Sequence, residues 1–241
     1  MGDRHPGLAG RVAVITGATG AVGRLIAQRL AERGTRLALL GTHAGRLTEL
    51  AQSLSLAADN VLTHVVDLRD RAATQAAAQV VLSRFGRLDI VLHLVGGYVG
   101  GQPALAVPVD DVNRMLEQHL WSTLNVTQAF APLLVSNGWG RLIAISSPHA
   151  TTTPPRRAAF AIGKAAQEAL LMTLAQELRG TGVTANVLVV RELSAPGDQP
   201  DPAAPPASDS TSPKEVAAAI LYLCSDEARA VNGARLPLDG R

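Results

Sequence analysis

The chain has 241 residues, of which 47% are hydrophobic and 17% charged, so a disordered chain is excluded and one well-buried core is expected. The 22 Lys and Arg residues nearly balance the 20 Asp and Glu residues, and the longest basic run is Arg156-Arg157. A nucleic-acid-binding protein would carry a basic patch, and a membrane span would need an apolar run of roughly 20 residues. The sequence has neither, so we expect a cytoplasmic protein that binds neither nucleic acid nor membrane.

Short apolar runs alternate along the chain with segments whose apolar residues recur with helical spacing. The first helical segment, for example, carries Val22, Ile26 and Leu30 on one face. In chain order, the predicted elements are strand Arg11–Thr16, helix Ala21–Arg33, strand Thr35–Leu40, helix Arg46–Leu56, strand Val61–Val66, helix Ala72–Phe85, strand Leu88–Val95, helix Val109–Asn137, strand Arg141–Ser146, helix Arg157–Arg179, strand Val183–Val190, helix Pro213–Ser225 and strand Ala234–Leu238.

Strands that read as continuous apolar runs, separated by helices, predict a parallel sheet covered by helices on both faces. We therefore predict a single α/β domain over residues 1–241, with a doubly wound sheet. The one low-complexity segment, residues 195–212, is rich in Pro, Ser and Asp and follows the sixth strand. It is predicted to be either a mobile flap over the substrate or a surface loop with no role in ligand binding.

A glycine-rich turn joins the first predicted strand to the first helix, running from Thr16 through Gly17 and Gly20 to Gly23. Glycines at this spacing allow a tight turn, close approach of a pyrophosphate and close packing of the helix, whose first N–H groups attract phosphate. A dinucleotide-binding site is predicted here. The alternative is that the glycines serve only the packing of strand against helix.

The residues after the next two strands bear on the choice of cofactor. The second strand is followed by Thr42 and His43, and no acidic residue occurs in this segment before Glu49. Without a carboxylate to bind the ribose 2′-hydroxyl and repel a 2′-phosphate, NADP(H) is favoured over NAD(H), with Thr42, His43 or Arg46 as candidate phosphate ligands. Asp67, after the third strand, is a candidate acceptor for the adenine amino group, or else a simple strand-end cap.

Taken together, these features resemble the short-chain dehydrogenase/reductase family over nearly the whole chain. The resemblance rests on TGATGAVG, VVDLRD, FGRLDIVL, GRLIAISS, the helix that contains Lys164, and the final PKEVAAAILYLCSDEARAVNGARLPLDG. These blocks occur in the family order with the family spacing. The resemblance implies a Rossmann-type sheet, a nicotinamide dinucleotide, a small-molecule substrate, and a homo-oligomer built on the helices Val109–Asn137 and Arg157–Arg179.

Members of this family use a serine to polarise the substrate oxygen, a tyrosine to transfer the proton, and a lysine to bind the nicotinamide ribose. The resemblance places the serine at Ser147 and the lysine at Lys164, but the tyrosine position is occupied by Phe160. Phenylalanine keeps the ring and loses the hydroxyl, so loss of this proton transfer with cofactor binding retained is predicted. A positioned acid or base contributes about 10²–10⁴-fold in rate. The asparagine that often assists aligns with His119.

Other side chains are candidates to replace the missing acid. His93, His119 and His149 are all expected near the cleft, and His149, two residues after the serine, is the best candidate. For each histidine alone the alternative is a hydrogen-bonded structural role, and their spacing matches no metal site. Tyr98 is a further candidate donor, and Arg191 a candidate ligand for an anionic substrate group or a cofactor phosphate.

Two functions from different classes remain open at this stage. The first is an enzyme derived from the family's reductases, which acts on a small carbonyl or alcohol with a surrogate acid, or catalyses a non-redox elimination or cyclisation. The second is a catalytically silent subunit that forms a hetero-oligomer with an intact family member. The sequence alone does not separate them.

Overall fold

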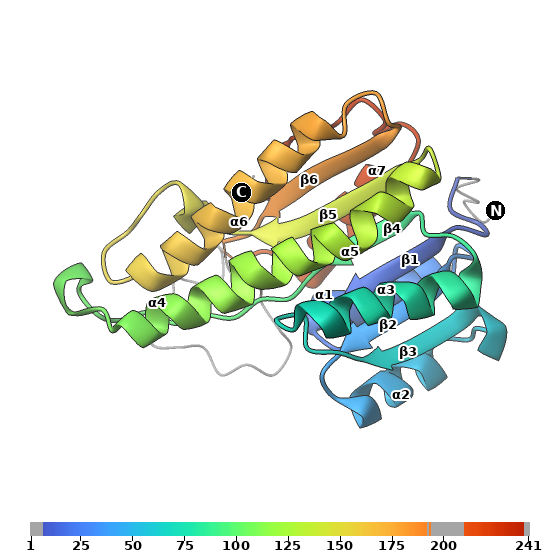
Figure 1. Cartoon of the computed structure of the whole chain (residues 1–241), viewed down its shortest axis with the longest axis horizontal. Helices are drawn as coiled ribbons and strands as arrows, with labels where there is room; N and C mark the ends of the chain where they lie inside the picture. The colour runs from blue at the N-terminus through green and yellow to red at the C-terminus, as the bar shows by residue number, and fades with distance from the viewer. Residues whose placement is uncertain (1–6, 192, 194–209, 239–241) are drawn as a thin grey trace.

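A computed structural model describes residues 7–191, 193 and 210–238, and these form one sheet of seven parallel strands with helices on both faces (Figure 1). This confirms the predicted doubly wound α/β fold. The predicted flap, residues 195–212, lies outside the described residues except for its last three positions. The strands are β1 (Val12–Thr16), β2 (Arg36–Gly41), β3 (Val61–Val65), β4 (Ile90–His93), β5 (Gly140–Ser146), β6 (Val183–Val189) and β7 (Arg235–Pro237).

The helices follow the predicted order, and short 3₁₀ turns lie at residues 58–60, 104–106 and 148–150. The first helix buries Val22, Ile26 and Leu30, the face that the sequence periodicity indicated. The helices are α1 (Ala21–Ala31), α2 (Ala44–Ser53), α3 (Arg71–Phe85), α4 (Val109–Met115), the π-helical segment η3 (Leu116–Trp121), α5 (Ser122–Ser136), α6 (Ala158–Glu177) and α7 (Pro213–Cys224).

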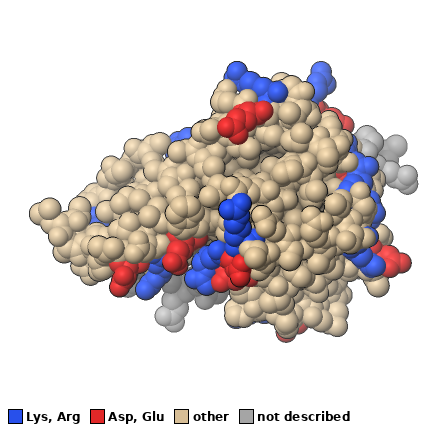
Figure 2. All heavy atoms as spheres, viewed as in Figure 1, with Lys and Arg blue, Asp and Glu red and all other residues tan. Residues whose placement is uncertain are grey.

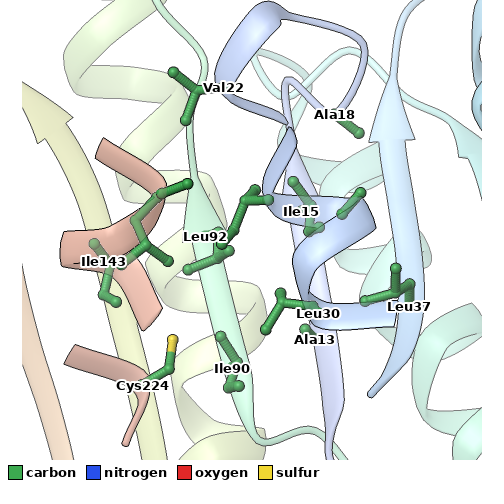
Figure 3. Packing of buried hydrophobic residues seen from close by; sticks show 14 of the residues in the cluster. Ala13, Ile15, Ala18, Val22, Leu30, Leu37, Ile90, Leu92, Ile143 and Cys224 are labelled. Atoms are coloured by element: carbon green, nitrogen blue, oxygen red, sulfur yellow. The ribbon is translucent and has the colours of Figure 1, made fainter. Parts of the chain in front are cut away.

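Alternate residues of each central strand belong to two separate hydrophobic clusters. Ala13 and Ile15 of β1 point to the face covered by α1, α2 and α7, where they pack with other buried aliphatic residues (Figure 3). Val12 and Val14 point to the opposite face, covered by α3, α5 and α6. Because both faces are covered, the central strands carry apolar residues on both sides. This explains why their sequences show continuous apolar runs rather than alternation.

The strand order β3-β2-β1-β4-β5-β6-β7 reverses direction between β1 and β4. In open α/β sheets, ligands bind at such a reversal, beyond the carboxyl ends of the strands. Figure 1 shows the segment between β4 and α4 and the segment between β5 and α6 projecting beyond these ends. The backbone N–H of Gly101 donates to the carbonyl of Arg156 at 2.7 Å, which joins the two segments. On the face shown in Figure 2, Lys and Arg side chains are scattered among Asp and Glu.

One predicted element differs from the structure. Residues 109–137 were expected to form a single regular helix, but the structure interrupts it with the π-helical segment η3 between α4 and α5. A π turn accommodates one extra residue per turn, and such turns are frequent at functional sites. Here the segment contains His119, which the wider turn brings into the protein interior. The periodicity of the sequence does not reveal it because the apolar residues on both sides remain helical.

At the opposite end of the sheet, where the strands begin, a buried carboxylate joins the starts of β1 and β4. Asp89 is fully buried and accepts hydrogen bonds from the guanidinium of Arg87 at 2.6 Å, that of Arg11 at 3.0 Å, the Val12 backbone N–H at 2.9 Å and the Asn137 side chain at 3.0 Å. Burial by itself would raise the pKa of Asp89. The hydrogen bonds from Arg87, Val12 and Arg11 outweigh it, so the pKa is lowered.

We predict that Asp89→Ala lowers the free energy of unfolding by about 3–5 kcal/mol, because it leaves buried donors and a cation without their acceptor. Urea denaturation followed by far-ultraviolet circular dichroism measures this change. Asp59→Ala is the control, since Asp59 pairs with Arg84 on an exposed surface and should have little effect. Equal effects of the two substitutions would contradict the structural role of Asp89.

Candidate active site

A cleft of about 490 Å³ opens at the reversal of strand order. The segments that follow four adjacent strands form most of its wall, and one helical face closes it. The lining residues are Gly17, Thr19 and Gly20 after β1, Gly41 and Thr42 at the end of β2, residues Val66, Asp67, Leu68 and Arg69 after β3, residues Leu94, Val95 and Gly96 after β4, and Arg114, Gln118 and Ser122 from α4, η3 and α5.

The glycine turn gives the cleft the shape that a dinucleotide requires. A Cβ at Gly23 would lie 2.5 Å from the carbonyl oxygen of Gly17, so only glycine lets α1 pack this closely against the turn. Gly20 is the N-cap of α1 and supplies no side-chain cap. The first N–H groups of a helix have no partner within the helix, so a pyrophosphate at this turn would satisfy them. The turn therefore fits the group that the sequence predicted.

Not every residue expected to bind the cofactor lines the cleft. Thr42 does, whereas His43 is exposed at the start of α2. Thr16 is fully buried, and its hydroxyl lies 2.9 Å from His93 Nδ1. Asp67 lines the cleft, but its carboxylate forms a bidentate ion pair with Arg69. The shortest contact, from Arg69 Nη2 to Asp67 Oδ2, is 2.7 Å. The hydrogen bonds from Arg69 lower the pKa of Asp67.

Sequence reasoning missed the helical wall of the cleft. Arg114, Gln118 and Ser122 line it at intervals of four residues, and this spacing was the available signal. The side-chain amide of Gln118 donates to the Gly96 carbonyl at 2.7 Å, so the helix is fastened to the segment after β4. Sequence reasoning had considered this region mainly for His119.

Lys164 is buried between α6 and the end of β5. Its ammonium donates to the Ile145 carbonyl at 2.8 Å and to the side-chain oxygen of Gln167 at 3.0 Å. Burial lowers the pKa of Lys164 to about 7, against the opposing effect of Glu168 one turn further along α6. The Glu168 carboxylate in turn accepts from the Ser146 hydroxyl and from the Arg235 guanidinium. The lysine is therefore surrounded by fixed partners at the active-site end of α6.

Three side chains far apart in the sequence surround the ring of Phe160. The ring centroids of Tyr98, His119 and His149 lie 5.3, 5.6 and 5.9 Å from that of Phe160, all in edge-to-face arrangements. Each of the three had been considered as a replacement donor from the sequence. The structure thus brings these candidates together around Phe160.

Ser147 and His149 form a direct polar pair beside this ring. The Ser147 Oγ lies 2.8 Å from His149 Nδ1, and the His149 backbone N–H donates to the same oxygen at 3.3 Å. Ser147 is buried and His149 is partly exposed. Burial, and then the charges of Arg157 and Arg191, lower the pKa of His149 below its ordinary value. Its imidazole is therefore neutral at pH 7, with solvent access on one side.

The other two histidines of the cleft are more deeply buried. His119 Nε2 donates to the Gly97 carbonyl at 3.1 Å, and its Nδ1 has no hydrogen-bond partner among the described residues. Burial and the charge of Lys164 lower the pKa of His119 to about 3, and the same two causes lower that of His93 to about 3. Both rings are neutral at pH 7 and are poor proton donors there.

The position of His119 depends on a glycine that sequence reasoning did not single out. A Cβ at Gly163 would lie 2.8 Å from the Met115 carbonyl oxygen and 3.0 Å from His119 Cδ2. Residue 163 therefore makes room both for the close approach of α6 to η3 and for the imidazole. Gly163 directly precedes Lys164 in the sequence, but its role becomes apparent only from the contact between α6 and η3.

The described part of the chain offers neither a metal site nor a membrane span. It contains no cluster of three His, Cys, Asp or Glu side chains arranged to hold a metal ion. None of the helices found there is long and apolar enough to cross a membrane.

Comparison with known proteins agrees with the fold. The sequence model described as short chain dehydrogenase matches residues 11–199. The chain is 31% identical to D-threitol dehydrogenase of Mycolicibacterium smegmatis over 97% of this chain and 93% of that protein. It is also 31% identical to 1,6-dihydroxycyclohexa-2,4-diene-1-carboxylate dehydrogenase of Pseudomonas putida, over 96% and 92%.

A solved short chain dehydrogenase from Bacillus anthracis superposes with a TM-score of 0.85 at 26% identity, covering 97% of this chain and 96% of that one. Its likeness extends over the whole sheet and both helical layers, as does that of the sequence relatives. The chain belongs to the short-chain dehydrogenase/reductase family, whose members bind a nicotinamide dinucleotide.

Proposed function

We propose that the protein is an NADP(H)-dependent oxidoreductase of a small alcohol or carbonyl compound, in which Ser147 and His149 carry the proton that a tyrosine usually carries. The observation that supports this best is the 2.8 Å contact between Ser147 Oγ and His149 Nδ1 beside the ring of Phe160. The relatives named above are dehydrogenases, and their names specify a polyol and a diol carboxylate.

A bound nicotinamide nucleotide supplies the hydride acceptor or donor. In alcohol oxidation, Ser147 Oγ accepts the hydrogen of the substrate hydroxyl and passes its own hydrogen to His149 Nδ1. The resulting imidazolium then loses a proton to solvent through the exposed side of the ring. The lowered pKa of His149 keeps the imidazole unprotonated at neutral pH, so the ring is able to accept this proton.

The cofactor preference rests on the end of β2. Thr42 lines the cleft there, and no carboxylate of the β2–α2 segment stands where an acid would bind the ribose 2′-hydroxyl. His43 and Arg46 are exposed next to it in the chain and add donors for a 2′-phosphate. These features favour NADP(H) over NAD(H).

Lys164 is proposed to hold the nicotinamide ribose, since it lies one turn after Phe160 on the same face of α6. In the family this lysine also lowers the pKa of the catalytic tyrosine, and here that role falls away because residue 160 is phenylalanine.

A homo-oligomer through α5 and α6 remains a prediction. Small residues of α6, together with the half-exposed Ile162, line a hollow of about 630 Å³ that a second copy of the chain could cover.

The first prediction concerns the proton path. His149→Ala should lower kcat by about 10²–10⁴-fold without weakening cofactor binding, because it removes the positioned base. Phe160→Tyr introduced into His149→Ala should recover part of this loss, since the phenol would restore a donor next to Lys164. NADPH formation or consumption across a panel of small diols, hydroxy acids, aldehydes and ketones gives the readout.

His64→Ala is the matched control for the proton path, because it removes an imidazole from β3, outside the cleft. Full activity of His149→Ala would show that the relay is wrong. If wild type and Phe160→Tyr both bind NADPH and neither reacts with any compound, the non-redox enzyme or the silent subunit becomes the better account.

The second prediction concerns cofactor choice. Wild-type protein should bind NADPH about tenfold more tightly than NADH, the size of one charge-assisted hydrogen bond. Thr42→Asp should reverse this order, because the new carboxylate repels a 2′-phosphate and accepts from a 2′-hydroxyl. Fluorescence titration measures both affinities, and Gly23→Asp, which blocks the glycine turn, should abolish both. Tighter binding of NADH by the wild type would refute the preference.

The third prediction uses the titration of Lys164. Its pKa is 10.5 in a solvated chain and about 7 in the fold, so the unfolded state binds more protons between pH 7 and pH 10. The stability of the wild type should therefore rise with pH across this window, relative to that of Lys164→Met. Denaturation of both proteins without cofactor at several pH values measures the difference. If the stability of the wild type relative to Lys164→Met stayed constant across this pH range, or fell as the pH rose, Lys164 would not be buried.

A further inference from the structure

An arginine lies within the cluster of rings around Phe160. The Arg157 guanidinium carbon lies 5.0 Å from the ring centroid of Tyr98, and that ring packs on Phe160 at 5.3 Å. The ring of His149 also packs on the same phenylalanine, with its centroid at 5.9 Å. The guanidinium therefore belongs to the same cluster of side chains as the proposed proton acceptor, His149.

A second arginine approaches from the end of β6. The backbone N–H of Val190 donates to the Ser146 carbonyl at 3.0 Å, so Arg191 follows directly where the chain passes Ser147. The charges of Arg157 and Arg191 both act on His149 and disfavour its protonated form. The electrostatic effect of both guanidinium groups therefore reaches the proposed proton acceptor.

Arg157 differs from the other arginines of the site in its partners. Arg235 pairs with Glu168 at 2.6 Å and Arg69 with Asp67 at 2.7 Å, whereas no carboxylate among the described residues lies within ion-pair distance of Arg157. Its contact with Tyr98 uses the face of the guanidinium plane. The N–H groups at the edge of that plane remain able to bind an oxyanion in a bidentate manner.

We propose that the substrate is a small hydroxy acid or oxo acid whose carboxylate, or equivalent oxyanion, binds Arg157 with Arg191 nearby. This inference rests on the proposed function, because it names the substrate class of the same site. The anion would neutralise the cationic side of the cleft and hold the reacting carbon next to Ser147. A bound anion would also offset the two charges that lower the proton affinity of His149.

The test compares acids with their uncharged esters. Pyruvate, acetoacetate and 4-oxopentanoate, each with its methyl ester, are titrated by calorimetry into protein saturated with NADP⁺, with which an oxo compound does not react. At least one acid should bind about 10–100-fold more tightly than its ester, the range of a charge-assisted bidentate contact. Arg157→Gln should remove this difference and leave ester binding unchanged, and Arg157→Lys should retain part of it.

Arg156→Gln is the matched control. It removes the same charge from the neighbouring residue, whose guanidinium approaches the Gly101 carbonyl and lines a different hollow. This variant should keep the preference for the acid. NADPH affinity, measured in parallel, should be the same in Arg157→Gln and wild type.

Three results would overturn the proposal. The first is that every acid binds as tightly as its ester. The second is that Arg157→Gln weakens the binding of the acid and of the ester equally. The third is weaker NADPH binding in Arg157→Gln, which would assign the arginine to a cofactor phosphate. Calorimetry requires no turnover, so the two proposals can fail separately. Tight, Arg157-dependent binding of an acid that is never oxidised or reduced would contradict the proposed function alone.

Discussion

The close packing of α6 against η3 is the constraint on which the site depends. It requires a residue without a side chain at Gly163, since a Cβ would lie 2.8 Å from the Met115 carbonyl oxygen. A buried hydrogen-bonded chain reinforces the contact, from Lys164 to Gln167 at 3.0 Å, from Gln167 to Thr123 at 3.0 Å, and from Thr123 to the His119 carbonyl at 2.6 Å. Through this packing Lys164 is held in the interior at the end of β5, and the rings of His119 and Phe160 meet edge to face at 5.6 Å.

The charges around this packing decide what the site can do with a proton. The ammonium of Lys164 and the low-dielectric interior keep His93 and His119 neutral, so neither supplies a proton at pH 7. His149 is the ring that combines a hydroxyl partner with access to solvent, and two arginine charges keep it a base. The arrangement is consistent with a dehydrogenase that takes a proton from an alcohol and releases it outward. The same arginines are the basis of the proposed preference for an anionic substrate.

Sequence reasoning succeeded where the signal is local and failed where it depends on two elements meeting. The strands and the glycine turn follow from periodicity and turn chemistry. It did not show that Thr16 turns inward to His93, because burial depends on the neighbouring strand. Nor did it reveal the π turn, or the space that Gly163 leaves for His119, since both arise from contacts between helices distant in sequence.

The dependence of kcat/KM for alcohol oxidation on pH tests the central claim most directly, namely that the proton leaves through Ser147 and His149. If the claim holds, wild-type activity rises with an apparent pKa below the ordinary histidine value of about 6.5 and then stays level to pH 9. The rise should disappear in His149→Ala, and Phe160→Tyr in that background should introduce a rise at higher pH. An activity that instead increases towards pH 10 in wild type and His149→Ala alike would indicate a phenol such as Tyr98 and would contradict the account.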